Sequence, residues 1–185
     1  MALPRAVRCR IARFSRGQDG SIAIEAVIIL PAIFMALMVM LSTFDAYRQH
    51  AINQKAAYTI GDLISRQTTP MDSQFLIGAR SLFDYLTRSS QPSSIRVTSV
   101  GWDADSGQFA LDWSRSVGAK PQATSEDVRE WKDRLPAMAE GDYITVVETW
   151  SEYDAPFSIG LQDEDIVNYI FTRPRYASPV HWSGS

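Results

Sequence analysis

The longest pattern in the chain is an apolar run from Ile22 to Phe44, in which Glu25 is the only charged residue. Its 23 residues reach roughly 35 Å as a helix, which exceeds the bilayer hydrocarbon thickness of about 30 Å. Between Val27 and Leu41 the run offers no polar side chain that a soluble helix would need on one face. The pattern therefore predicts a membrane-spanning helix over residues 21–44.

The stretch that follows, residues 45–68, contains no proline and only one glycine, so the helix is expected to continue outward through it. Its apolar residues fall on two stripes at helical spacing. The first stripe holds Phe44, Tyr47, Ala51 and Tyr58, and the second holds Ile52, Ala56, Ile60 and Leu63. Two stripes fit either two separate partners, one of them the chain's own sheet, or a single broad core face.

Beyond residue 68 the periodicity changes repeatedly. A helical pattern covers 71–88 with Asp72 as its N-cap, and a second, over 125–135, starts at Thr124 with Asp127 three residues later. Strand patterns cover 94–100, 108–113, 143–150 and 166–172. The first two strands flank an Asp- and Gly-rich turn at 103–107. The segment 115–123 is expected to be a loop. This order predicts an α+β domain with an antiparallel sheet.

The predicted organisation thus has four parts. Residues 1–20 form a basic leader, 21–44 the transmembrane helix, 45–68 its outward continuation, and 69–185 the exported α+β domain. No internal repeat and no low-complexity tract interrupts this order.

Charge is distributed unevenly about the apolar run. Five arginines and one acid precede it, whereas residues 45–185 hold 13 of the 18 Lys and Arg but 19 of the 21 Asp and Glu. The positive-inside rule therefore predicts a cytoplasmic N-terminus and an exported C-terminal part. An acidic domain without a basic patch argues against nucleic-acid binding.

A cleaved secretory signal peptide is the main competing interpretation of a basic leader followed by an apolar run. The run is too long for an ordinary signal core, and it contains Glu25. No small-x-small cleavage site closes it either, because Phe44 stands where a small residue is needed. The only cysteine, Cys9, lies in the leader, so the exported part forms no intramolecular disulfide and is expected to depend on core packing.

Motifs for catalysis are missing from the sequence. It has two histidines, no HExxH, no GxSxG and no Gly-rich phosphate loop, so we expect no enzymatic activity, no cofactor, no metal and no small-molecule substrate. Asp103, Asp105 and Gly107 resemble the start of a calcium loop, but the twelfth position holds Ser114, which favours a plain hairpin turn. The acidic stretch 163–165 is interpreted as a solvated loop or helix cap, and Trp113 and Trp150 as packing residues.

Glu25 remains the most informative ionisable residue. A carboxylate inside the hydrocarbon costs roughly 2.5–3.5 kcal/mol on insertion scales, so it marks a functional site by default, although snorkelling towards the headgroups is an alternative. Cleavage between Gly20 and Ser21 would place a new ammonium on Ser21, one helical turn from Glu25. In a helical assembly the ammonium of one subunit can then pair with Glu25 of its neighbour and set their axial register.

Residues 17–48, GQDGSIAIEAVIILPAIFMALMVMLSTFDAYR, resemble the N-terminal signature of TadE-like minor pilins, or pseudopilins, of the tight-adherence (Flp, type IVb) pilus system. The shared features are a Gly before a short small and apolar stretch, a Glu, an apolar run with a Leu-Pro step, and a polar-aromatic exit. Residues 142–175 match in outline, whereas Ser21 and Ala26 depart from the aromatic residues common in related pilins. TadE-like, TadF-like and TadG-like proteins fit the quoted residues alike, although TadG-like ones are usually much longer.

This resemblance implies that Gly20 is the last leader residue, Ser21 the new N-terminus and Glu25 the carboxylate for recognition and assembly. It implies a prepilin peptidase, other pilins and pilus assembly proteins as partners, with a role in surface attachment and biofilm formation. The protein would be a single-pass protein of the bacterial inner membrane with a periplasmic domain. Pro31 is expected to kink the helix. The alternative is an uncleaved anchor whose exported domain binds a partner in an envelope complex.

Overall fold

The computed structural model describes residues 19–89, 91–153, 164–176 and 179–184. The basic leader expected over 1–20 lies almost wholly outside the described residues. Two compact units can be distinguished, one up to Thr43 and one from Phe44 onward. Helix α2 (Asp19–Ser65) contributes to both units.

Between Ile24 and Leu41, Glu25 is the only charged residue of α2, and every side chain is exposed or half-buried. An 18-residue stretch of α2 has a mean hydropathy of 2.6, and none of the residues in that stretch is buried. Large side chains such as Val27, Leu30 and Phe34 are each more than 60% exposed. The helix is therefore long and apolar enough to span a membrane.

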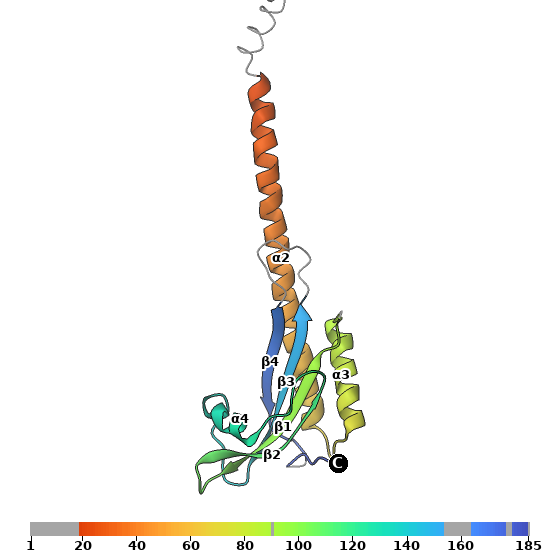
Figure 1. The fold of residues 1–185 in the computed structure, drawn as a ribbon, viewed down its shortest axis with the longest axis vertical. Helices are drawn as coiled ribbons and strands as arrows, with labels where there is room; N and C mark the ends of the chain where they lie inside the picture. The colour runs from red at the N-terminus through yellow and green to blue at the C-terminus, as the bar shows by residue number, and fades with distance from the viewer. Residues whose placement is uncertain (1–18, 90, 154–163, 177–178, 185) are drawn as a thin grey trace, which may run out of the picture. The chain divides into compact units, whose positions relative to one another are not determined.

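The second unit contains a four-stranded antiparallel sheet (Figure 1). Its strands are β1 (Ser94–Asp103), β2 (Gln108–Val117), β3 (Tyr143–Tyr153) and β4 (Glu164–Thr172), in the spatial order β2-β1-β3-β4. Two hairpins, β1-β2 and β3-β4, thus meet along the central β1-β3 pair. The β1-β2 ladder shifts register between Ser99 and Val100.

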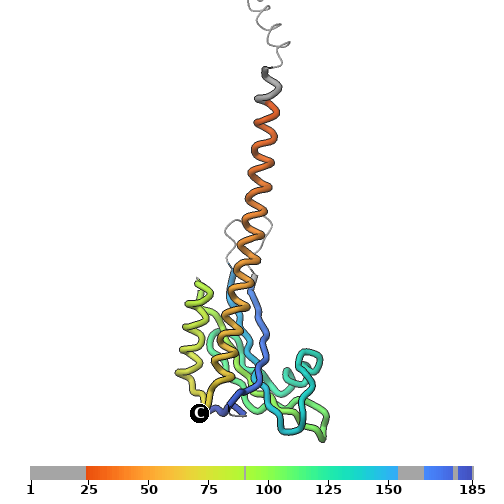
Figure 2. Tube along the Cα trace, turned by 180° about the vertical axis from the view of Figure 1, so that it is seen from behind, coloured from red at the N-terminus to blue at the C-terminus, as the bar shows by residue number. Residues whose placement is uncertain are grey.

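Two helices cover one face of the sheet. The second half of α2 and helix α3 (Ser73–Thr87) lie side by side there, as Figures 1 and 2 both show. The core between helices and sheet consists of buried apolar residues from every layer: Ala56, Ala57, Ile60 and Ile64 of α2, Met71, Leu76, Ala79 and Phe83 of α3 and the turn before it, Ile95 and Val97 of β1, Val147 of β3, Ile170 of β4, and Val180. Ile95 and Val97 are two positions apart on β1 and therefore point to the same face of the sheet, whereas β2 contributes the partly buried Trp113 and Val117.

A smaller cluster covers the opposite face. Helix α4 (Ser125–Glu130) and the 3-10 turn η1 (Trp131–Asp133) place Val128 and Trp131 against Val100 and Ile144. A full capping box between Thr124 and Asp127 begins α4. Because the loop before this helix crosses the sheet, both faces of the domain are covered without any disulfide.

The C-terminal segment closes the end of the domain where α2 stops and α3 begins. Met71 donates its backbone N–H to the His181 carbonyl, and Ser183 donates to the Met71 carbonyl, both at 2.8 Å. Arg175 donates its backbone N–H to the Ser65 carbonyl at the end of α2. Its guanidinium also lies 3.0 Å from Asp62, so this part of the segment is tied to the last turn of α2.

The α+β class with an antiparallel sheet is confirmed, as are the 71–88 helix with its Asp72 cap and the β1-β2 hairpin. The helix expected over 125–135 is too long, because α4 ends at Glu130 and tightens into η1. The loop expected at 115–123 is also wrong at its start, since β2 continues to Val117 opposite Ile95. Of the two stripes on α2, the second is buried or half-buried, whereas Phe44, Tyr47, Ala51 and Tyr58 are exposed.

We expect Phe83→Ala to destabilise the domain by about 3–5 kcal/mol, because this fully buried ring sits at the centre of the helix-sheet core. Tyr85→Ala, on the same helix and 80% exposed, is the matched control and should change stability by less than about 0.5 kcal/mol. Denaturant unfolding of the detergent-solubilised full chain, followed by tryptophan fluorescence, measures both. Equal losses in the two variants would contradict this packing.

Candidate functional site

The residues singled out near the N-terminus lie in the first turns of α2. The helix begins at Asp19, so Gly20 and Ser21 belong to its first turn, and Glu25 follows four residues after Ser21. Positions four apart share one face of a helix, one turn away from each other. The Glu25 side chain is exposed on this helix, as are those of Ile24 and Val27. The carboxylate is therefore positioned to meet a partner from outside its own helix.

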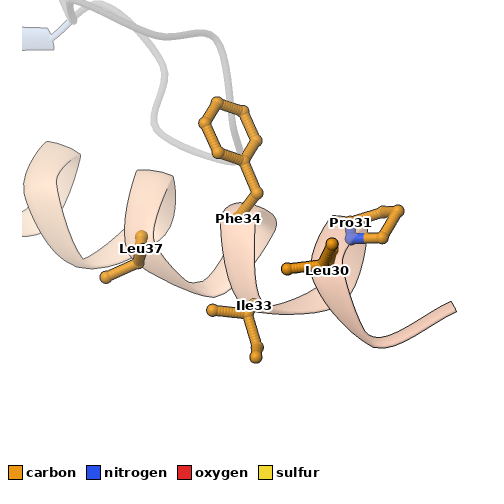
Figure 3. A pocket seen from close by; sticks show the side chains of 5 residues that line it. All are labelled: Leu30, Pro31, Ile33, Phe34 and Leu37. Atoms are coloured by element: carbon orange, nitrogen blue, oxygen red, sulfur yellow. The ribbon is translucent and has the colours of Figure 1, made fainter. Parts of the chain in front are cut away.

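Pro31 lies within α2, and the helix continues past it without a break. Because proline has no N–H, the carbonyl four residues earlier loses its usual helical donor. The adjoining surface is a shallow groove lined only by Leu30, Pro31, Ile33, Phe34 and Leu37; Figure 3 shows Phe34 and Ile33 projecting to different sides of the helix. This groove offers apolar contact and no polar group for chemistry. The kink expected at Pro31 stays a prediction.

Among the described ion pairs of the second unit, Arg96 and Glu148 form the most enclosed one. They stand opposite each other on β1 and β3, and the guanidinium Nε donates to the carboxylate at 2.6 Å. Only 13% and 7% of these side chains are exposed. Arg96 also donates to the Pro121 carbonyl at 3.2 Å and lies 5.1 Å from the centroid of the Trp150 ring. The pair thus holds the loop before α4 against the sheet.

Tyr169 lies beside this pair on the same sheet face, opposite Glu148 on β4. The Arg134 guanidinium carbon sits 3.8 Å from the centroid of the Tyr169 ring, and Trp131 meets that ring edge-on at 5.6 Å. The Tyr169 hydroxyl is buried and has no hydrogen-bond partner among the described residues. Burial raises the pKa of Tyr169 well above its usual value, and Arg134 opposes that shift only in part.

This cluster is suited to holding the fold. Glu148 is bound by Arg96, the described neighbours include no histidine or cysteine, and the hydroxyls of Thr98 and Ser114 hydrogen-bond to each other at 3.0 Å. No nucleophile therefore has a base within hydrogen-bond reach here. Within the described ranges there is also no group of three His, Cys, Asp or Glu side chains arranged to hold a metal ion.

The structure describes the acidic segment 103–107 completely and the acidic segment 163–165 in part. Asp103 uses both carboxylate oxygens inside its own turn, accepting from the Asp105 and Ser106 N–H groups and from the Ser106 hydroxyl. The hydrogen bonds to Ser106 lower the pKa of Asp103. Asp163 lies outside the described residues. Glu164 and Asp165 begin β4 and pair with β3, so the loop or helix cap expected at 163–165 is wrong for these two residues. Asp165 is 3.4 Å from Lys120.

The strand tryptophans take packing roles, as expected. Trp113 donates its Nε1–H to the Val180 carbonyl at 2.8 Å and lies 5.6 Å from the Trp182 ring centroid. Trp150 is half-buried beneath Arg96, with the Lys120 amine 5.9 Å from its ring centroid. These rings connect the sheet to the C-terminal segment and to the loop before α4.

Two polar contacts were missed by sequence reasoning. One is the Arg96–Glu148 pair. The sequence showed only that each of two apolar strands contains one charged residue, and it did not show that the two residues face each other. The other joins α2 to β3, where the Tyr153 hydroxyl donates to Asp45 at 3.2 Å. Burial, reinforced by the Asp45 charge, raises the pKa of Tyr153. Both contacts join residues that are far apart in the sequence, and the helical and strand patterns contain no information about such pairs.

Searches of protein-family models, curated proteins and solved structures find no match to this chain.

We expect Tyr169→Phe to raise domain stability at neutral pH by about 1 kcal/mol, because it removes a buried hydroxyl that lacks a partner. The wild type should lose stability as pH rises above about 10, the pKa of tyrosine in the unfolded chain, since the folded domain disfavours the phenolate. The variant should lose less. Unfolding midpoints across this pH range test both points, with Tyr85→Phe as the exposed control; identical alkaline losses in wild type and Tyr169→Phe would overturn the assignment.

Proposed function

We propose that this protein is a minor pilin or pseudopilin of a tight-adherence (Flp-type) pilus. It is a non-enzymatic structural subunit that primes or caps the fibre and supports surface attachment and biofilm formation. The single observation that carries the proposal is Glu25, an exposed carboxylate one turn after Ser21, in a stretch of α2 that is otherwise apolar and unburied from Ile24 to Leu41. This arrangement supports the TadE-like signature of residues 17–48.

Electrostatics gives Glu25 a role in assembly. An isolated carboxylate in hydrocarbon costs roughly 2.5–3.5 kcal/mol, so it gains by pairing with a cation. After cleavage at the Gly20–Ser21 bond, the ammonium of Ser21 on an incoming subunit is such a cation. Pairing one subunit's ammonium with the next subunit's Glu25 neutralises both charges and fixes their axial offset.

The uncovered helix supports the same role. The apolar side chains between Ile24 and Leu41 have no protein partner within the described residues, so they are available to lipid before assembly and to neighbouring helices after it. The chain is then a single-pass protein of the bacterial inner membrane, with its N-terminus in the cytoplasm and its α+β domain in the periplasm. Its partners are a prepilin peptidase, other pilins and the pilus assembly proteins.

We expect mass spectrometry of the membrane-extracted protein to find Ser21 as the N-terminal residue, because a prepilin peptidase cuts on the cytoplasmic side. Cells lacking the peptidase should retain the full leader, and a bulky Gly20→Leu variant should retain it in wild-type cells. An intact Met1 leader in peptidase-positive cells would reject the pilin proposal and favour an uncleaved anchor whose domain binds an envelope partner.

Replacing Glu25 with Ala should leave membrane insertion intact, because the substitution makes the apolar segment more hydrophobic. It should reduce incorporation of the protein into sheared pili by at least about tenfold, which corresponds to about 1.4 kcal/mol of lost pairing free energy. Carbonate extraction reports insertion and immunoblotting of sheared fibres reports incorporation. Glu140→Ala, an exposed acid in the second unit, serves as the control and should be incorporated normally. Unchanged piliation by Glu25→Ala would make Glu25 a tolerated interfacial residue.

A further inference from the structure

A polar groove lies between α2 and the C-terminal end of α3. Arg48, Gln49 and Ile52 line it from α2, and Leu86, Thr87 and Arg88 line it from α3, around a volume of about 310 Å³. Gln49 donates its Nε2–H to the Thr87 carbonyl at 3.0 Å, which fixes the two helices together at this point. The groove therefore presents two guanidinium groups on a rigid pair of helices.

In the part of the chain that the structure describes, both arginines are available to bind an anion. Among the described residues, neither Arg48 nor Arg88 has an acidic partner within 4 Å, and both side chains are exposed. Two described acids that are close in sequence to these arginines, Asp84 and Asp45, already have partners. Asp84 accepts from the Ser93 N–H at 3.1 Å and faces Arg80. Asp45 accepts from the Tyr153 hydroxyl.

Arg88 also occupies an unusual backbone conformation. It caps α3 in the left-handed region, with φ 52° and ψ 40°, and is the only described non-glycine residue with positive φ. Glycine is the usual residue at this kind of helix end, and a residue with a Cβ costs roughly 1 kcal/mol more there. An arginine at this position is therefore better explained by its side chain than by its backbone.

Distance along α2 places the groove at the membrane surface once the apolar segment is inserted. Residues 26–44 carry no charge and extend roughly 28 Å as a helix, close to the hydrocarbon thickness. Arg48 and Ile52 follow Phe44 by four and eight residues, or roughly 6 and 12 Å. The headgroup layer is about 5–8 Å thick on each side, so the groove begins where lipid phosphates lie.

Aromatic side chains beside the groove fit the same location. Tyr47 precedes Arg48 and is 74% exposed, while Tyr85 on α3 is 80% exposed. Tyrosine at a membrane-water boundary keeps its ring against lipid and its hydroxyl in water. Each groove arginine thus has an exposed tyrosine within three residues of it in the chain.

We infer that the Arg48–Arg88 groove binds the phosphate headgroup of an anionic phospholipid, which docks the end of α3 on the outer surface of the membrane before assembly. The inference rests on the membrane insertion contained in the proposed function. Guanidinium groups bind phosphate oxygens with charge-assisted hydrogen bonds, and two of them on opposite walls can hold one headgroup between them. Release of this headgroup would accompany the subunit's departure from the membrane.

The test uses the full chain in nanodiscs of phosphatidylcholine alone or mixed equally with phosphatidylglycerol. Native mass spectrometry of the detergent-released protein measures the ratio of the two retained lipids. The wild type should retain phosphatidylglycerol preferentially, and Arg48→Gln and Arg88→Gly should each lower the ratio about fivefold. Arg129→Gln removes the same charge from exposed α4 and should leave the ratio unchanged.

Arg88→Gly separates binding from folding. Because glycine adopts the left-handed conformation without cost, this variant should unfold at the wild-type temperature or above it in phosphatidylcholine nanodiscs, yet lose the lipid preference. Inorganic phosphate tests the other source of the same chemistry. Phosphatidylglycerol should raise the wild-type midpoint, measured by tryptophan fluorescence, whereas millimolar inorganic phosphate in neutral nanodiscs should not.

Three outcomes would overturn the inference. They are an unchanged lipid ratio in Arg48→Gln and Arg88→Gly, an equal loss in Arg129→Gln, and stabilisation by inorganic phosphate equal to that by the anionic lipid. Each outcome is distinguishable from failure of the pilus proposal, because that proposal is tested by the N-terminal residue of the extracted protein and by the incorporation of Glu25→Ala into fibres. A chain that carbonate extracts from membranes would refute the insertion on which both depend.

Discussion

The structure depends on the packing of one continuous helix, α2, which meets two different surroundings along its length. From Ile24 to Leu41 its side chains are apolar except for Glu25 and none is buried, whereas from Asn53 onward one face is buried against the sheet and α3. Small residues keep the helix close to the sheet: Ala56, Ala57 and Gly61, where an added Cβ would lie 3.5 Å from Ile170. The domain's core is thus built on the same element that carries Glu25.

The rest of the domain follows from covering a four-stranded sheet on both faces without a disulfide. One face is sealed by two helices and the other by α4, η1 and the loop before them, which Arg96 and Glu148 attach to the central strands. A buried ion pair of this kind contributes little net free energy but strongly disfavours arrangements that leave either charge alone. It therefore selects one position for the loop more than it adds to stability.

Both proposals made for this protein concern contacts with partners. In the second unit, the Arg96–Glu148 and Thr98–Ser114 contacts join neighbouring strands, and the Ser114 hydroxyl accepts from the Ala123 N–H of the loop before α4. Glu25 on the apolar helix and the Arg48–Arg88 groove have opposite charge and suit different partners, an ammonium within an assembly and a phosphate at a membrane surface. Both proposals assign α2 the task of interaction, whereas the sheet provides a rigid support for it.

Local pattern determined the long helix, the Asp72-capped α3, the β1-β2 hairpin and the α+β class, because helical and strand periodicities are set by neighbouring residues. It also singled out Glu25, whose charge is conspicuous within an apolar run. Only the tertiary structure decided which stripe of α2 is buried, that β2 extends to Val117, and that Arg96 meets Glu148 across 52 residues. The reason is physical: sheet register and the order β2-β1-β3-β4 bring distant residues together, and a residue's nearest neighbours in sequence carry no record of those pairings.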